Sequence, residues 1–380
     1  MLRSLVRLVA LGTAAMILAL LVPLGGAIAQ AKTSTHSSSQ FTVFATGLNN
    51  PRGLRFGPDG NLYVADAGLG GTNSTIGQCQ QVPGPPGPGP DTGGFTSRIV
   101  KFTSAGTRTT VADHLPSTVT TPGSGSNVLG VEDVQFIDGT LYGMEAGAGC
   151  SHGLAGTDNT IFRVNANGTT TTVADLSAFL KANPVAHPDA GDSEPDGTWY
   201  SMTQVHDVIY ATEPNHQEVD RITRHGNISR VVDLSTLFVP PNNWQGPTSM
   251  VYHNGKFYFG TLGTFPVRPG TQNIYEMTPG GKVKIAASGL TAVLGVAFDR
   301  QGRLYALETI TVAGFPSPQA AGSGTVVRVN SDGTLTTIAT GLTFPTAMTF
   351  DPDGDALYVS NNGYLPVPGA GQIVRIPVDQ

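Results

Sequence analysis

Acidic side chains recur at one position of an internal repeat in this sequence. Three residues after each of six recurring tyrosines stand Asp66, Glu145, Glu213, Thr261, Glu308 and Asn361. Four of these six residues are acids, although Asp and Glu together supply only 27 of the 380 residues. Carboxylates gathered on one face attract cations and polar ligands, so these acids could form a negatively charged funnel. The alternative is that each acid accepts hydrogen bonds from nearby backbone N–H groups or pairs with an Arg at a strand end.

A second group of candidate residues lies at the start of six short apolar segments of the same repeat. Aligning these segments brings together Arg52, Glu132, Tyr200, Thr248, Leu294 and Thr346. The next position holds short side chains, namely Gly53, Asp133, Ser201, Ser249, Gly295 and Ala347. Short side chains suit a crowded axis where six strands converge, so packing alone could explain this group. The functional alternative is a ligand-binding mouth lined by its polar members, Arg52, Glu132, Asp133 and Tyr200.

The elements that must position these residues are short β-strands. A bulky apolar residue followed by Tyr occurs six times, at intervals of 79, 68, 48, 47 and 53 residues. The dipeptides are Leu62-Tyr63, Leu141-Tyr142, Ile209-Tyr210, Phe257-Tyr258, Leu304-Tyr305 and Leu357-Tyr358. The shorter intervals match a four-stranded propeller blade, and the longer ones indicate loop insertions. Gly and Pro supply 76 of the 380 residues and charged residues only 13%, which favours strands joined by turns over long helices.

Each repeat continues with a third strand in which apolar and polar residues alternate. These strands are expected over 98–102, 160–164, 218–222, 273–277, 325–329 and 372–376. Five of them lead through a glycine turn into a fourth strand, but the last is followed by only four residues. Residues 41–48 (FTVFATGL) resemble residues 335–342 (LTTIATGL), the fourth strand of the fifth repeat. We therefore predict that the N-terminal strand completes the last blade of an all-β, six-bladed propeller, which removes the open edges that a solenoid would keep.

The N-terminus has the features of a secretory signal peptide. Two arginines precede an apolar stretch over residues 8–26, and residues 27–29 (AIA) supply the small residues of a cleavage site. The stretch is also just long enough for an uncleaved membrane anchor, although Pro23 and two glycines break its last turn. We expect export to a secreted, periplasmic or other extracytoplasmic location, with no membrane span after cleavage. The predicted parts are a signal peptide (1–29), a flexible leader (30–40) and one propeller domain (41–380).

The charge and the cysteines of the mature chain restrict its partners and its compartment. Loss of the signal peptide moves the formal net charge from −6 to −8, because the peptide holds two Arg and no acid. An acidic domain without basic clusters is a poor partner for nucleic acid or anionic lipid. Cys79 and Cys150 follow the second strands of consecutive repeats, so their loops leave the same face of the propeller. In an oxidising compartment we expect these two residues to form a disulfide.

Some segments resemble a known family. Residues 50–66 (NPRGLRFGPDGNLYVAD) resemble the NHL-type repeat. Residues 341–346 (GLTFPT) and 353–361 (DGDALYVSN), with the order of long and short blades, narrow the resemblance to the ScyD/ScyE family. That family consists of exported bacterial proteins named for members encoded beside scytonemin biosynthesis genes. The resemblance covers the whole mature chain through blade motifs, so it implies an extracytoplasmic propeller and supplies no catalytic residues.

Neither a metal site nor a nucleophile follows from the spacing of polar residues. A gluconolactonase-like site would need several carboxylate or amide ligands at the channel mouth, where only Glu132 and Asp133 stand, both from one repeat. We predict no Gly-x-Ser-x-Gly nucleophile elbow, so an acyl-transfer serine is not supported; residues 149–153 (GCSHG) have this spacing but lie in a loop after the second strand of a repeat. We predict no cofactor and no resident metal. Two acid–histidine pairs also lack metal-ligand spacing: Glu213 with His216, and Glu145 with His152.

Two insertions carry weaker signals. Asp175 precedes residues 176–182 (LSAFLKA) and is a candidate N-cap for one short helix. The segment 187–196 lacks the spacing of a calcium loop, so we interpret it as a solvated loop. Its acids are Asp189, Asp192, Glu194 and Asp196.

Two classes of function remain open. The first is an exported propeller that binds a small molecule, a glycan or a protein partner on its long-loop face. The second is a propeller hydrolase of the lactonase or strictosidine-synthase kind, in which acids at the mouth act as a base or as ligands. The sequence does not decide whether the chain is an enzyme, and we assign no catalytic residue. The candidate ligand-binding residues are Arg52, Asp66, Glu132, Asp133, Glu145, Tyr200, Glu213 and Glu308.

Overall fold

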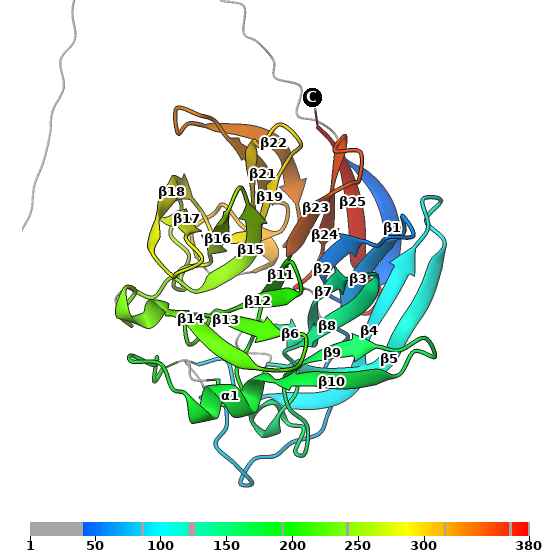
Figure 1. Cartoon of the computed structure of the whole chain (residues 1–380), viewed down its shortest axis with the longest axis vertical. Helices are drawn as coiled ribbons and strands as arrows, with labels where there is room; N and C mark the ends of the chain where they lie inside the picture. The colour runs from blue at the N-terminus through cyan, green and yellow to red at the C-terminus, as the bar shows by residue number, and fades with distance from the viewer. Residues whose placement is uncertain are drawn as a thin grey trace, which may run out of the picture. The chain divides into compact units, whose positions relative to one another are not determined.

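Short antiparallel strands form six sheets around a common axis in the computed structural model of the chain (Figure 1). This arrangement confirms the predicted all-β, six-bladed propeller. The predicted signal peptide and leader lie outside the residues that the structure describes. Those residues are 41–84, 87–120, 127–191, 194–240, 243–314, 317–364 and 367–378.

Each blade is one antiparallel sheet whose first strand lies nearest the axis. Blade 1 contains β2 (Pro51–Phe56), β3 (Leu62–Asp66), β4 (Thr92–Phe102), β5 (Arg108–Val119) and the short β6 (Val128–Leu129). Blade 2 contains β7 (Val131–Ile137), β8 (Thr140–Glu145), β9 (Thr160–Val164) and β10 (Thr170–Asp175). Blade 3 contains β11 (Ser201–Val205), β12 (Val208–Glu213), β13 (Glu218–Thr223) and β14 (Ile228–Asp233).

The remaining blades repeat this order, and all six predicted third strands are confirmed. Blade 4 contains β15 (Pro247–His253), β16 (Lys256–Thr261), β17 (Gln272–Met277) and β18 (Val283–Leu290). Blade 5 contains β19 (Val293–Phe298), β20 (Leu304–Glu308), β21 (Gly324–Val329) and β22 (Leu335–Leu342). Blade 6 contains β23 (Ala347–Phe350), β24 (Ala356–Asn361), β25 (Gly371–Pro377) and β1 (Thr42–Leu48).

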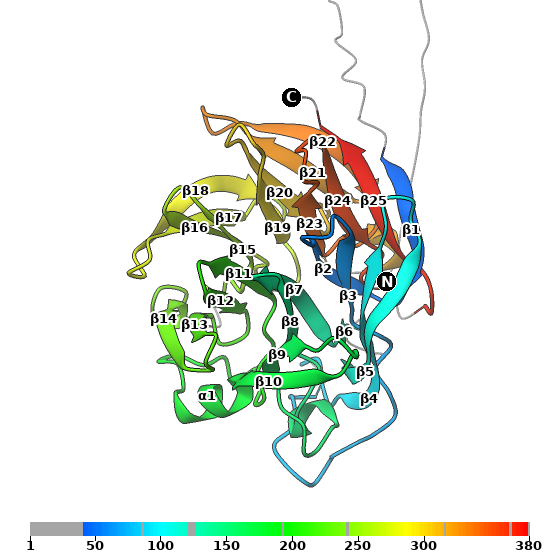
Figure 2. The same ribbon diagram turned by 45° about the vertical axis from the view of Figure 1, so that its right-hand side comes forward.

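The N-terminal strand closes the ring. β1 pairs antiparallel with β25, with Thr42 opposite Arg375 and Leu48 opposite Gly371. Figure 2 shows the blue β1 beside the red β25. The first strand of each blade also contacts that of the next, and β23 contacts β2. The prediction that residues 41–48 complete the last blade is therefore confirmed.

The repeated tyrosine packs against the neighbouring blade, which explains why it recurs. In four of the six blades its ring meets edge-on a phenylalanine at the end of the next blade's first strand, with ring centroids 4.9–5.3 Å apart. Large aromatic rings in this edge-to-face arrangement stabilise a packed interface. The pairs are Tyr63–Phe136, Tyr258–Phe298, Tyr305–Phe350 and Tyr358–Phe56.

Helical segments are confined to the insertions. The one α-helix described, α1 (Leu176–Ala182), starts after Asp175, whose side chain accepts a hydrogen bond from Ala178 N, as the sequence predicted. Three short 3-10 helices are also described: η2 (Cys150–His152), η3 (Leu234–Thr236) and η4 (Pro318–Ala320). No helix within the described part of the chain is long and apolar enough to cross a bilayer.

Removal of β1 should destabilise the whole ring. A chain that begins at Asn49 loses the pairing with β25 and the burial of Leu48, which is fully buried and alone contributes about 2 kcal/mol. We expect a melting temperature at least several degrees lower than that of a matched chain that begins at Phe41. Equal melting temperatures for the two chains would show that β1 is not part of the cooperative fold.

Candidate functional site

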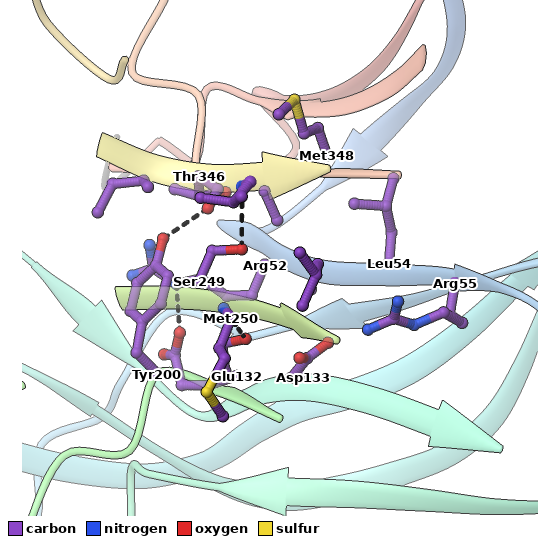
Figure 3. Close-up of a pocket in the computed structure, with 16 residues that line it drawn as sticks. Arg52, Leu54, Arg55, Glu132, Asp133, Tyr200, Ser249, Met250, Thr346 and Met348 are labelled. Atoms are coloured by element: carbon purple, nitrogen blue, oxygen red, sulfur yellow. Dashed lines mark hydrogen bonds and ion pairs between the residues drawn. The ribbon is translucent and has the colours of Figure 1, made fainter. Parts of the chain in front are cut away.

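The first strands of the six blades line a narrow channel along the axis (Figure 3). Its walls include Arg52 from blade 1, Glu132 and Asp133 from blade 2, and Tyr200 from blade 3. The free volume is about 30 Å³, an order of magnitude below the roughly 300 Å³ or more of a typical small-molecule pocket. Only the end of a ligand can therefore enter this channel.

Side chains at the two aligned positions link the blades to one another. Asp133 Oδ2 accepts a hydrogen bond from Met202 N of the next blade at 2.8 Å. Ser201 and Ser249 do the same with their hydroxyl oxygens at 3.1 Å. Gly53 leaves room for the Asp133 side chain, because a Cβ at Gly53 would lie 2.0 Å from Asp133 Oδ1. The small residues at this position therefore pack the axis, and three polar members also hold consecutive blades together.

The first aligned position contributes a second set of links. Thr248 Oγ1 donates to Val293 O, and Thr346 Oγ1 donates to Pro51 O, each at 2.6 Å and each into the next blade. Arg52 differs from these threonines, because its Nη2 donates to Val128 O in β6 of its own blade and to Asn127 Oδ1. A guanidinium has five N–H donors where a threonine has one, so Arg52 keeps further donors after making these bonds.

Arg52 and Glu132 form a buried ion pair at one end of the channel. Arg52 Nε lies 3.2 Å from Glu132 Oε2, and each side chain is only 2% exposed. Arg52 Nη1 and Glu132 Oε1 have no hydrogen-bond partner within the described part of the chain. Buried polar atoms are nearly always satisfied, so an unpaired donor and an unpaired acceptor on two paired side chains indicate a place for a further group.

Two tyrosines border this pair. The guanidinium of Arg52 lies over the ring of Tyr364, 4.8 Å from its centroid, which is a cation–π contact. Tyr200 donates its hydroxyl hydrogen to Thr346 O at 2.5 Å (Figure 3). Burial raises the pKa of both phenols, so neither is ionised near neutral pH.

Burial also changes the acidity of Glu132. The loss of solvent raises the pKa of Glu132 to about 7, although the positive charge of Arg52 opposes this shift. Burial, with the charge of Glu132 as a smaller cause, raises the pKa of the nearby Glu145 to about 8. The Glu132 carboxyl group can therefore exchange a proton near neutral pH.

The acids that follow the repeated tyrosines do not line this channel. Asp66, Glu145, Glu213 and Glu308 are at most 6% exposed and accept hydrogen bonds from backbone N–H groups. Asp66 accepts from Asn49 N, Glu213 from Thr198 N and Glu308 from Thr291 N, at 2.6–2.8 Å. In each case the donor belongs to the segment that enters the first strand of the same blade. This geometry matches the second interpretation from the sequence, in which the acids accept hydrogen bonds at strand ends and do not form a charged funnel.

Removing one of these acids should reduce stability. Glu213 accepts from the backbone N–H groups of Thr198 and His216, and Glu213→Ala leaves both buried donors unpaired. Each unpaired donor costs about 1–3 kcal/mol, so we expect a clearly lower melting temperature. Asp353→Ala, at an exposed turn, is the matched control and should change little. If Glu213→Ala melts like the control, the acids are not structural and a role in ligand binding regains support.

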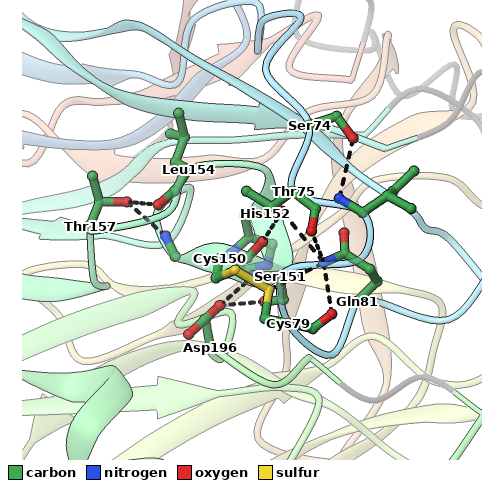
Figure 4. The surroundings of a disulfide bond; sticks show 12 residues. Ser74, Thr75, Cys79, Gln81, Cys150, Ser151, His152, Leu154, Thr157 and Asp196 are labelled. Atoms are coloured by element: carbon green, nitrogen blue, oxygen red, sulfur yellow. Dashed lines mark hydrogen bonds between the residues drawn. A yellow bond between two sulfur atoms is a disulfide. The ribbon is translucent and has the colours of Figure 1, made fainter.

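The disulfide predicted between Cys79 and Cys150 is present, with the two Cα atoms 6.3 Å apart (Figure 4). It joins the β3–β4 loop of blade 1 to η2 of blade 2. Thr75 Oγ1 donates to Cys150 O at the same junction. Ser151 donates from its N and Oγ to Asp196 Oδ2, each at 2.6 Å, so a third insertion joins the same assembly.

A buried histidine lies beside the disulfide. His152 Nδ1 is 2.6 Å from Ala148 O, and Nε2 is 2.8 Å from Glu194 Oε2, so both ring nitrogens face oxygen acceptors. Burial lowers the pKa of His152, but hydrogen bonding to Glu194 and the charges of Glu194 and Asp91 outweigh it and raise the pKa to about 9. The prediction that residues 187–196 form a solvated loop is wrong for Glu194 and Asp196, because both side chains are buried against their partners. Asp192 lies outside the described residues.

The His152–Glu194 pair should make stability depend on pH. The pKa of His152 is higher in the folded chain than its ordinary value near 6.5, so folding binds a proton. The stabilisation is fully present below pH 6.5 and is lost as the pH rises through about 9. We expect the difference in melting temperature between the unmodified chain and His152→Gln to shrink between about pH 6 and pH 9.5. An unchanged difference over this range would exclude a protonated His152 in the folded state.

The described residues bring together no group of three or more His, Cys, Asp or Glu side chains that could hold a metal ion. In the channel, the guanidinium of Arg52 already neutralises Glu132. The donor set there therefore fits a hydrogen-bonding group better than a divalent cation. We derive no metal-dependent step for this site.

Two residues of the site could not be found from the sequence. Tyr364 belongs to the β24–β25 loop and is not one of the six repeated tyrosines. Asn127 precedes the irregular strand β6, which has no counterpart in the other blades. Neither residue occupies a position of the sequence repeat, so the sequence contains no signal that identifies them as part of the site.

Comparison with solved structures confirms the fold. A gluconolactonase from Xanthomonas campestris aligns over 89% of both chains at 13% identity, with a TM-score of 0.52. An oxidoreductase from Thermus thermophilus, described as a glucose dehydrogenase, aligns over 89% of this chain and 99% of its own at 15% identity, with a TM-score of 0.54. A protein of unknown function from Bacteroides thetaiotaomicron gives 11% identity over 89% of this chain and 72% of its own, with a TM-score of 0.54. At such identities the likeness shows the fold alone.

Comparison with models of known protein families gives no match, and comparison with curated proteins gives none either. The finer resemblance to the ScyD/ScyE family therefore stays a prediction.

Proposed function

We propose that this chain is an exported binding propeller that holds a hydroxylated small molecule or glycan on the face where the channel opens. The observation that carries the proposal is the buried pair of Arg52 and Glu132 at one end of the channel. Two donor atoms of Arg52, Nε and Nη1, and one acceptor, Glu132 Oε1, have no hydrogen-bond partner in the described part of the chain.

A hydroxyl group fits two of these atoms. Its oxygen can accept a hydrogen bond from Arg52 Nη1 while its hydrogen is donated to Glu132 Oε1, so one group satisfies both. An unmade buried hydrogen bond costs about 1–3 kcal/mol for each group, which gives the arrangement a preference for such an occupant. The narrow channel admits one hydroxyl, and the rest of the ligand lies over the neighbouring tyrosines and the long loops.

Export is part of the proposal. The N-terminal sequence has the features of a signal peptide, and the Cys79–Cys150 disulfide suits an oxidising compartment. An extracytoplasmic propeller related to the ScyD/ScyE family agrees with both features. The disulfide and its hydrogen bonds tie the long loops of blades 1 and 2 on the proposed binding face.

Glu132 also keeps the hydrolase alternative open. A buried carboxyl group whose pKa is raised to about 7 is suited to act as a general base near neutral pH. The gluconolactonase and glucose dehydrogenase neighbours share only the fold with this chain, so they do not select a reaction.

Glu132→Gln should weaken the binding of hydroxylated probes. We expect methyl β-D-glucoside to bind the unmodified chain in calorimetry or saturation-transfer NMR, and Glu132→Gln to lower its affinity at least tenfold, because the acceptor loses its charge. The matched control is Glu276→Gln, since Glu276 pairs with Lys256 and Lys284 on blade 4, outside the lining of the channel. Equal affinities for the two variants would exclude the Arg52–Glu132 pair as the binding site.

The same proteins distinguish binding from hydrolysis. Incubation with D-glucono-1,5-lactone should leave the lactone intact beyond its spontaneous rate if the chain only binds. Hydrolysis by the unmodified chain that Glu132→Gln abolishes and Glu276→Gln preserves would replace the binding function with the hydrolase.

A further inference from the structure

The hydrogen-bond partners of Arg52 belong to an irregular part of blade 1. Arg52 Nη2 donates to Val128 O in β6 and to Asn127 Oδ1, directly before β6. The strand β6 has only two residues and pairs with the end of β5. It also leads into β7, which carries Glu132. Such a short ladder is marginal by itself, so the positions of Arg52 and Glu132 depend on what holds the end of β5.

The end of β5 packs against η2 of blade 2. Thr118, near the end of β5, is fully buried, and its Oγ1 donates to His152 O of η2 at 2.9 Å. Two other acceptors lie farther from this hydroxyl group, Thr92 O at 3.2 Å and Asp91 Oδ2 at 3.5 Å. Gly93, which pairs with Thr118, allows the close approach, because a Cβ there would lie 2.7 Å from His152 O. The η2 segment therefore braces the β4–β5 hairpin from the side of blade 2.

The disulfide holds η2 in this place. Cys150 is the first residue of η2, and its bond to Cys79 crosses to the β3–β4 loop of blade 1 (Figure 4). The same loop also pairs with the hairpin, since Asn73 and Gly93 exchange two backbone hydrogen bonds at 2.9 Å. A helix of three residues is too short to be stable by itself. The disulfide therefore fixes η2 and the β3–β4 loop to each other around the end of the hairpin.

We infer that the Cys79–Cys150 disulfide and Thr118 position the Arg52–Glu132 pair, so that the ligand site is complete only in the oxidised chain. The inference rests on the proposed function and adds how its site is regulated. The disulfide fixes η2, η2 fixes Thr118 at the end of β5, and β5 holds β6 with the partners of Arg52. Disulfides persist in oxidising compartments and are rare in the cytosol. The chain therefore binds its ligand strongly only after export.

Reduction of the disulfide tests this link. Cys79 and Cys150 are both partly exposed, so dithiothreitol can reach them. The reagent gives two electrons and two protons to the disulfide, which leaves two thiols and cyclic oxidised dithiothreitol. We expect the affinity for methyl β-D-glucoside to fall several-fold, within the roughly 2- to 30-fold effect of changes that act on a site through intervening residues. Oxidised glutathione, which accepts two electrons and two protons from the thiols, should restore the affinity.

Thr118→Val breaks the link while the disulfide stays intact. Valine has nearly the shape of threonine but no hydroxyl group, so the bond to His152 O is lost. We expect the affinity for methyl β-D-glucoside to fall several-fold at temperatures well below the melting transition. The matched control is Thr110→Val, because Thr110 lies on the same strand and is exposed. Melting temperatures show which proteins stay folded, and Thr118→Val decides if the reduced chain does not.

Hydrogen exchange measures the same link without a ligand. Peptides over residues 127–134 cover β6 and the start of β7. Their backbone amides should exchange faster after reduction and in Thr118→Val, because the short β6 ladder opens more often when its support is lost. Residues 293–298 form β19 of blade 5, three blades away from blade 2, and their exchange should not change.

The outcomes separate the positioning of the pair from the proposed function. If the oxidised chain binds the glucoside and neither reduction nor Thr118→Val changes its affinity, the inference is wrong and the proposed function stands. This holds even if exchange over residues 127–134 becomes faster. If the oxidised chain binds no glucoside at millimolar concentration, the proposed function is wrong and the inferred regulation of binding fails with it. Faster exchange would then support only the structural link from the disulfide to β6.

Discussion

Six strands that converge on one axis must be held together where there is no room for large side chains. In this chain, side-chain-to-backbone hydrogen bonds across the blade junctions meet that constraint. Three side chains accept hydrogen bonds from backbone N–H groups of the next blade: Asp133, Ser201 and Ser249. Two hydroxyl groups, those of Thr248 and Thr346, donate to backbone carbonyl groups of the next blade. Farther from the axis, the repeated tyrosine packs on a phenylalanine of the following blade. The pairing of β1 with β25 makes this ring continuous.

The candidate site arises at the aligned position where blade 1 has an arginine. Thr248 and Thr346 donate to the next blade at this position, whereas Arg52 donates to Val128 O of its own blade and contacts blade 2 through its ion pair with Glu132. Among the described residues, Arg52 Nη1 has no hydrogen-bond partner. Glu132 neutralises the charge and keeps an unpaired oxygen. In blade 1, a position that is structural in other blades thereby has unpaired polar atoms for a ligand, and the fold is unchanged. The strand-end acids differ from this pair, because each accepts hydrogen bonds from backbone N–H groups of its own blade.

The regular part of this molecule could be predicted from the sequence. The apolar–Tyr dipeptides and the similarity of residues 41–48 to residues 335–342 determined the blade number and the ring closure, because each blade repeats the same packing problem. The alignment of inner strands also placed Arg52, Glu132, Asp133 and Tyr200 together correctly. The irregular part could not be predicted. Tyr364, Asn127 and the His152–Glu194 pair lie on insertions whose contacts depend on loop conformation, which no repeat encodes.

The most direct measurement is a crystal structure of the propeller, residues 41–380, soaked in methyl β-D-glucoside. We expect electron density for the sugar at the Arg52–Glu132 pair, with one hydroxyl oxygen within about 3 Å of both Arg52 Nη1 and Glu132 Oε1. Density for the sugar elsewhere, with only water or another side chain on those two atoms, would contradict the claim that this buried pair is the ligand-binding site.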